Sequence, residues 1–228
     1  MNSRTFRPIS LVLVTFVATF AALVALAVSG GHDAAAHDHS SHATAATISG
    51  KELALRQDMR KLWEDHVTWT RLAVISLIAD APDTQATVGR LLRNQVDIGN
   101  AVKPFYGAAA GKQLTGLLRE HILIAADLIA AAKAGNQKAV ASEQARWNAN
   151  ADRIAAFLSS ANPRHWKLGA MKAMMRSHLG LTTNEVVARL RQNWTADVRA
   201  YDRIHTQILG MADMLSSGLV MQFPGRFR

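Results

Sequence analysis

The sequence predicts an all-helical protein: an up-and-down antiparallel bundle of five to six helices, preceded by an N-terminal signal or anchor segment. Glycine (14 of 228 residues) and proline (5) are scarce, which disfavours a fold of many short turns. Alanine and leucine are abundant, and runs of β-branched residues are few. Apolar residues recur at steps of three and four, and hydrophobic residues make up 49% of the chain, enough for a substantial core.

Residues 1–29 have the composition of an export signal. Arg4 and Arg7 give a positively charged start, residues 9–28 are almost wholly apolar, and small residues up to Ser29 offer a cleavage site. The apolar run of 20 residues is also long enough to span a bilayer as an uncleaved anchor. In both cases the basic start places the rest of the chain outside the cytoplasmic membrane. We therefore expect an extracytoplasmic protein, periplasmic or secreted, which is held at the inner membrane if the segment is retained.

A histidine-rich linker follows at residues 30–47. It holds four of the nine histidines, His32, His37, His39 and His42. Short tracts of this composition are typical of metal binding, because neutral imidazole is a good ligand for Cu, Ni and Zn. The alternative is a flexible polar tether, and the sequence leaves both interpretations open.

Residues 48–228 form the predicted bundle. Helix-breaking residues at Pro82, Pro104, Gly135 and Pro163 separate its helices. The connections are short, so neighbouring helices should be antiparallel. The predicted helices span residues 49–80, 84–103, 108–134, 137–161, 167–178 and 182–222.

Two capping boxes mark predicted helix starts. Ser49 with Glu52 begins the first helix, and Thr182 with Glu185 begins the last. The second box predicts a short fifth helix followed by a long sixth one.

Three histidines lie on apolar faces of predicted helices. His66 belongs to the first helix, His121 to the third and His205 to the last. In antiparallel helices with level ends these residues fall at one height, so we expect them to meet inside the bundle. Two or three imidazoles, with Asp97 or Asp152 as a further ligand, form a candidate metal site.

The same layer has a structural interpretation. Each histidine would then hydrogen-bond a neighbour, such as Asn94, Asn150, Tyr201 or a tryptophan indole, and fix the register of the helices. Buried ionisable clusters tend to mark functional sites, but structural networks have the same composition. The sequence does not decide between the two.

A second candidate metal site lies on the predicted helix 167–178. Met171, Met174, Met175 and His178 fall on one face of that helix. Thioethers together with imidazole suit Cu(I), which makes copper the favoured metal, with zinc or nickel as alternatives. Methionine at helical spacing also serves as core filler.

Other classes of function are disfavoured by residue content. The net charge is +9, but the basic residues are scattered among acids, without the aromatic-rich basic block that nucleic-acid binding needs. The absence of cysteine excludes disulfides, thiolate zinc sites and Fe–S clusters. Neither Glu64 with His66 nor Glu120 with His121 has the Glu-x-x-His spacing of di-iron bundles. Phosphate loops and nucleophile elbows are also absent, which favours a non-enzymatic role.

Several short motifs resemble a family of small, uncharacterised bacterial helical-bundle proteins. The motifs are residues 62–71 (Leu-Trp-Glu-Asp-His-Val-Thr-Trp-Thr-Arg), 94–99, 104–107, 211–214 and 222–224, and the similarity extends over about residues 53–224. Members sometimes carry glycosyltransferase or acetylglutamate-kinase labels, which the residues of this chain do not support. The resemblance implies a helical bundle and no particular activity.

Two functional hypotheses follow from the sequence. The first is an exported metal-binding bundle with a buried histidine layer. The second is a non-catalytic, membrane-tethered structural or interaction module, whose buried histidines only hold the packing together. The first expects a metal ion as partner, the second a membrane contact through the N-terminal segment.

Overall fold

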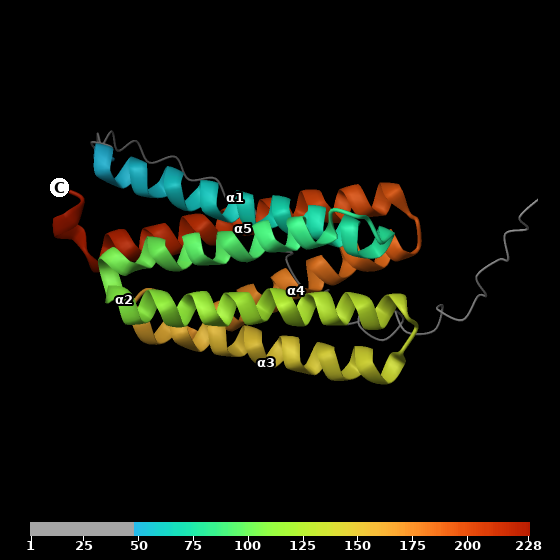
Figure 1. Cartoon of the computed structure of the whole chain (residues 1–228). Coiled ribbons are helices and arrows are strands. Elements are labelled where there is room, and N and C mark those ends of the chain that lie inside the picture. Colours follow the sequence, from blue (N-terminus) through green and yellow to red (C-terminus); the bar gives the residue numbers. More distant parts are fainter. Residues whose placement is uncertain (1–47) are drawn as a thin grey trace, which may run out of the picture. The chain divides into compact units, whose positions relative to one another are not determined.

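The computed structural model describes residues 48–228, which are built from helices (Figure 1). The elements are α1 (Gly50–Ala79), α2 (Thr84–Lys133), α3 (Gln137–Ala161), α4 (Leu168–Leu190), α5 (Trp194–Gln222) and the 3-10 helix η1 (Pro224–Arg226). No strand occurs within this part of the chain, and the predicted all-helical fold is confirmed. The predicted signal or anchor segment and the linker histidines His37, His39 and His42 lie outside the described residues.

Helix α2 consists of two antiparallel halves joined by a sharp bend. Gly107 has φ 84° and ψ 169°, a conformation that glycine adopts far more readily than other residues. Pro104, one turn earlier, lacks the amide hydrogen that would continue the helical ladder. The chain reverses direction at this bend (Figure 1). The first half, residues 84–106, and the second half, residues 108–133, correspond to two of the helices that the sequence predicts.

The two halves of α2 pack closely through a pair of glycines. A Cβ added to Gly99 would lie 2.7 Å from the carbonyl oxygen of Gly111 and would overlap the side chain of Thr115. A Cβ added to Gly111 would lie 2.6 Å from the carbonyl oxygen of Gly99. Backbone atoms cannot move away as a flexible side chain can, so the hairpin depends on glycine at both positions.

One predicted helix boundary is wrong. The sequence placed a break before Thr182, but α4 continues to Leu190, and α5 begins at Trp194. The Thr182 hydroxyl donates to the carbonyl oxygen of His178 within the helix, so it does not act as a cap. The cap of α5 is Asn193, whose side chain accepts a hydrogen bond from the backbone of Ala196.

The helices form a closed ring around one core. Each helix packs against the next in chain order, and α5 packs against α1. The turns after α1, α2 and α4 lie at one end of the bundle, and the bend of α2, the α3–α4 connection and the C-terminus lie at the other (Figure 1). No helix within residues 48–228 combines the length and apolar content needed to cross a membrane.

Candidate functional site

Three histidines are buried at mid-bundle. His66 comes from α1, His121 from the second half of α2 and His178 from α4, and their exposed fractions are 3%, 4% and 5%. All three line one cavity. The ring centroids of His66 and His178 are 5.9 Å apart. We call these three residues the histidine layer.

His205 lies outside the histidine layer. Its Nε2 is 3.2 Å from a carboxylate oxygen of Glu64, and the side chain is 34% exposed. The predicted face of α5 is buried from Ile208 onward, but before it the buried residues are Asp197, Ala200 and Ile204, so His205, one position past Ile204, lies at the edge of that face. His178, which the sequence assigned to a methionine face, occupies the third place.

Each histidine of the layer is held by an amide side chain 29 residues later in the chain. The amide belongs to the following helical segment, so each pair joins two neighbours in the ring. The distances from Nδ1 are 3.2 Å for His66 with Gln95, 2.8 Å for His121 with Asn150 and 3.1 Å for His178 with Gln207.

A second hydrogen bond recurs beside each pair. An amide nitrogen on the following segment donates to the backbone carbonyl four residues before the histidine. The bonds run from Asn94 to Leu62 (3.0 Å), from Asn150 to Leu117 (3.1 Å) and from Gln207 to Met174 (3.4 Å). The bundle is therefore an internal repeat of three helical hairpins.

The repeat extends to the core. Equivalent residues around the three histidines are buried in every hairpin. They lie seven residues before (Met59, Leu114, Met171), three residues before (Trp63, Leu118, Met175) and one residue after (Val67, Ile122, Leu179). The histidines are 55 and 57 residues apart in the chain, and this spacing, with the amide 29 residues later, is the sequence signal for the layer.

The hydrogen-bond network assigns the protons of His66. The side-chain nitrogen of Gln95 donates to the carbonyl oxygen of Leu91 at 2.9 Å and to the side-chain oxygen of Asn94 at 3.1 Å. That nitrogen is therefore the atom facing Nδ1 of His66. An amide nitrogen does not accept a hydrogen bond, so Nδ1 carries no proton and shares the two amide hydrogens with the oxygens of Leu91 and Asn94. A neutral ring that accepts at Nδ1 carries its proton on Nε2, so His66 offers a donor.

His121 and His178 have the opposite tautomer. The amide nitrogens of Asn150 and Gln207 donate to backbone carbonyls, which leaves their oxygens facing the rings. Nδ1–H of each ring therefore donates to an amide oxygen. The Nε2 atoms of both rings carry a lone pair, and no hydrogen bond within residues 48–228 uses an Nε2 atom of the histidine layer.

The histidine layer is neutral at physiological pH. Burial lowers the pKa of His66 well below its usual 6.5, and the nearby His178 and His121 lower it further. Burial lowers the pKa of His121 to about 4, with His178 adding to the effect. The pKa of His178 is also lowered by burial.

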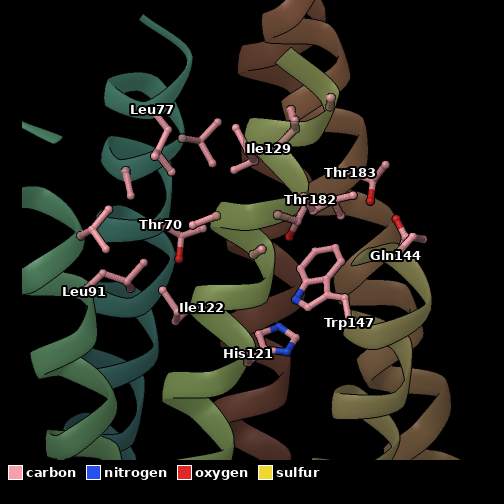
Figure 2. A pocket seen from close by; sticks show the side chains of 18 of the residues that line it. Thr70, Leu77, Leu91, His121, Ile122, Ile129, Gln144, Trp147, Thr182 and Thr183 are labelled. Carbon is pink, nitrogen blue, oxygen red and sulfur yellow. The ribbon is translucent and has the colours of Figure 1, made fainter. Parts of the chain in front are cut away.

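The cavity beside the layer has a volume of about 130 Å³ and an almost wholly apolar wall (Figure 2). It extends from the histidines to the last turns of α1, α2 and α4, where Leu77, Ala132 and Leu190 line it. Thr70 and Thr182 also line it, but their hydroxyls donate to carbonyls of their own helices. The polar groups left for a ligand are the histidine rings and the amide of Gln144, which also lines the cavity.

Three of the five unpaired buried side-chain atoms within residues 48–228 belong to neighbours of the histidine layer. They are Nε1 of Trp63, Nε1 of Trp147 and Oε1 of Gln95; the other two are Nη1 of Arg90 and Nε1 of Trp166. Trp147 lines the cavity, and its ring lies beside that of His121, with centroids 5.2 Å apart (Figure 2). Buried donors are nearly always paired in native proteins, but this indole N–H is itself covered and does not open onto the cavity.

The other predicted ligands lie elsewhere. Asp97 pairs with Arg93 at 3.4 Å, and Asp152 pairs with Lys172 at 2.9 Å. Met171, Met174 and Met175 all pack in or against the hydrophobic core. Within residues 48–228, no three His, Cys, Asp or Glu side chains are placed to hold one metal ion.

A buried ion network joins α1, α4 and α5 near the turn between α4 and α5. Arg71 donates to Glu185 at 2.6 Å and to Asp197 at 2.9 Å, and Arg189 donates to Asp197 at 2.9 Å. Burial raises the pKa of Glu185 to about 7, although Arg71 opposes the shift. The network ties the start of α5 to the two helices that carry His66 and His178.

Comparisons of the chain with known protein families, with curated proteins and with solved structures give no match. The candidate site is therefore defined by its own geometry: three oriented, neutral imidazoles at one end of an apolar cavity.

Proposed function

We propose that the bundle binds a small, largely apolar organic molecule in the cavity beside the histidine layer. The proposal rests on one arrangement: an apolar cavity is lined by three neutral histidines, and no hydrogen bond within residues 48–228 uses their Nε2 atoms. Ligand sites combine an apolar wall with a few convergent polar groups in this way. A purely structural histidine layer would not leave polar atoms facing a void.

The cavity volume restricts the size of the ligand. An apolar cavity of about 150 Å³ accepts benzene, whereas drug-sized ligands occupy about 300–1,000 Å³. At about 130 Å³ the site fits a molecule with one small ring or a short chain. This size supports a small-molecule carrier or sensor over a haem or lipid protein.

The proposal is tested by thermal unfolding of the full chain with toluene as the probe. A ligand at ten times its Kd stabilises the folded state by about 1.4 kcal/mol. For a domain of this size that corresponds to a rise in Tm of about 3–6 °C. The larger side chain of the variant Ala125→Leu would fill the cavity directly beside His121 and should abolish the rise.

Ala145→Leu is the matched control, because Ala145 is exposed on α3 and does not line the cavity. It should respond to toluene as the unmodified chain does. If toluene shifts none of the three proteins, or shifts Ala125→Leu as much as the others, the cavity is not a binding site.

A second candidate function is metal binding at His121 and His178. The observation that favours it is the orientation of both rings, since metal-ligating histidines usually donate their other N–H to an oxygen acceptor. Copper suits a site of two imidazoles better than zinc, which takes four ligands.

Titration with Cu(I), Zn(II) and Ni(II) tests the metal candidate. All four linker histidines are first replaced (His32, His37, His39 and His42 to Ala), so that they do not contribute. His121→Ala or His178→Ala should then lower the affinity, whereas His205→Ala should not. Equal affinity in all four proteins would eliminate the histidine layer as a metal site.

A further inference from the structure

The tautomers of the histidine layer specify the kind of head group that fits. Resting on the proposed function, we infer that the ligand carries an uncharged head group with both hydrogen-bond donors and an acceptor, as a carboxamide or an alcohol does. The inference concerns which ligand the site selects, whereas the proposed function requires only that the cavity is occupied.

The layer presents both a hydrogen-bond donor and hydrogen-bond acceptors at one cavity. His66 presents Nε2–H, a donor, because Gln95 occupies its Nδ1 with an N–H. His121 and His178 present lone pairs, because their Nδ1–H groups are donated to Asn150 and Gln207. A primary carboxamide has one acceptor oxygen and two N–H donors, which is the complement of one donor and two acceptors.

The geometry places these groups around a common space. All three histidines line the cavity, and the rings of His66 and His178 are neighbours, 5.9 Å apart between centroids. A head group in the cavity can therefore approach both rings from the cavity side. The remaining wall near the layer is apolar, so the hydrocarbon part of the ligand extends toward Leu77 and Ile129.

Charged head groups fit poorly. A carboxylate only accepts hydrogen bonds, and it would face the lone pairs of His121 and His178. An ammonium group only donates, and it would face the N–H group of His66. Either ion would also be stripped of water in a cavity whose polar lining is neutral, which is unfavourable without a counter-charge.

The test compares ring compounds of similar size at pH 7.5 by calorimetric titration of the full chain. The probes are toluene, benzyl alcohol, benzamide, benzoate and benzylammonium. Benzamide should bind at least tenfold more tightly than toluene, and the two ions at least tenfold more weakly than toluene. If benzoate or benzylammonium binds as tightly as benzamide, or if toluene equals benzamide, the inference is overturned while the cavity remains a binding site. If no probe binds, the proposed function fails as well.

A variant and a spectrum test the role of the rings. His178→Phe removes a lone pair but keeps a ring, so the ratio of benzamide to toluene affinity should fall toward one, while His205→Phe should preserve it. The imidazole ¹⁵N shifts of the unmodified protein give the tautomers directly, without any variant. Nε2–H at His66 and Nδ1–H at His121 and His178 support the inference, and a shared tautomer for all three overturns it.

Discussion

Replacing His121 should flatten the pH dependence of stability between pH 7 and pH 5. The pKa of His121 falls from 6.5 in the unfolded chain to about 4 in the fold. The unfolded chain therefore binds more protons in this window, so the stability that comes from the neutral ring is present above pH 6.5 and is lost as the pH falls through 4.

The size of this effect follows from the two pKa values. For one group with pKa 6.5 unfolded and about 4 folded, moving from pH 7 to pH 5 lowers the free energy of unfolding by about 2 kcal/mol. His121→Phe cannot titrate at this position, so its loss over the same interval should be about 2 kcal/mol smaller than that of the unmodified protein. The unpaired Asn150 that it leaves affects both pH values equally and cancels in the difference.

Glu185 provides the opposing case. Its pKa rises from 4.5 in the unfolded chain to about 7 in the fold, so its contribution to stability is present below pH 4.5 and is lost as the pH rises through 7. Acidification from pH 7 to pH 5 recovers about 2 kcal/mol through this group. Glu185→Gln should therefore make the protein more sensitive to acid, where His121→Phe makes it less sensitive.

Urea unfolding at both pH values, followed by circular dichroism, measures the differences. The prediction concerns the change between pH 7 and pH 5 in each protein, not the absolute stability. An unchanged pH dependence in His121→Phe would refute the conclusion that the buried ring is neutral because of its environment.

Three further predictions concern packing and are checked by the same unfolding assay. Asn150→Ala should lower the free energy of unfolding by about 2–4 kcal/mol, because it leaves His121 and a backbone carbonyl without their partner. Asn148→Ala, on the exposed face, should change it by less than about 0.5 kcal/mol. Gly99→Ala should destabilise the fold by more than about 2 kcal/mol through backbone overlap, while Gly116→Ala, with open space around it, should stabilise by about 0.5–1 kcal/mol. Arg71→Met should lower the free energy of unfolding by about 3–5 kcal/mol, because two buried carboxylates lose their shared partner. Near-normal stability of that variant would contradict the ion network.

The fold class was predictable because it depends on local signals. The breaks at Pro82, Gly135 and Pro163 and the cap at Ser49 act within a few residues, and the structure contains a helix end or bend near each. Thr182 was misleading because a threonine followed by a glutamate three residues later has the same pattern inside a helix as at its start. Only the tertiary contacts, which turn Glu185 toward Arg71, distinguish the two cases.

The histidine layer was only partly predictable. His66 and His121 were found by their position on apolar faces. His205 was expected as the third member because it lies one position from the buried Ile204, whereas His178 was assigned to the methionine face. The pairing of each histidine with an amide 29 residues later depends on the register between neighbouring helices, which periodicity within one helix does not specify. Comparing the three hairpins with one another would have revealed it.

Our central proposal is that the histidine layer forms the polar end of a ligand site. The most direct test is to titrate the ¹⁵N-histidine-labelled full chain with benzamide and follow the imidazole resonances. The account predicts saturable shifts of the Nε2 signals of His66, His121 and His178, with His205 unaffected because it lies at the surface beside Glu64. Signals of the buried three that stay in place up to saturating benzamide, or a shift of His205 as large as theirs, would contradict it.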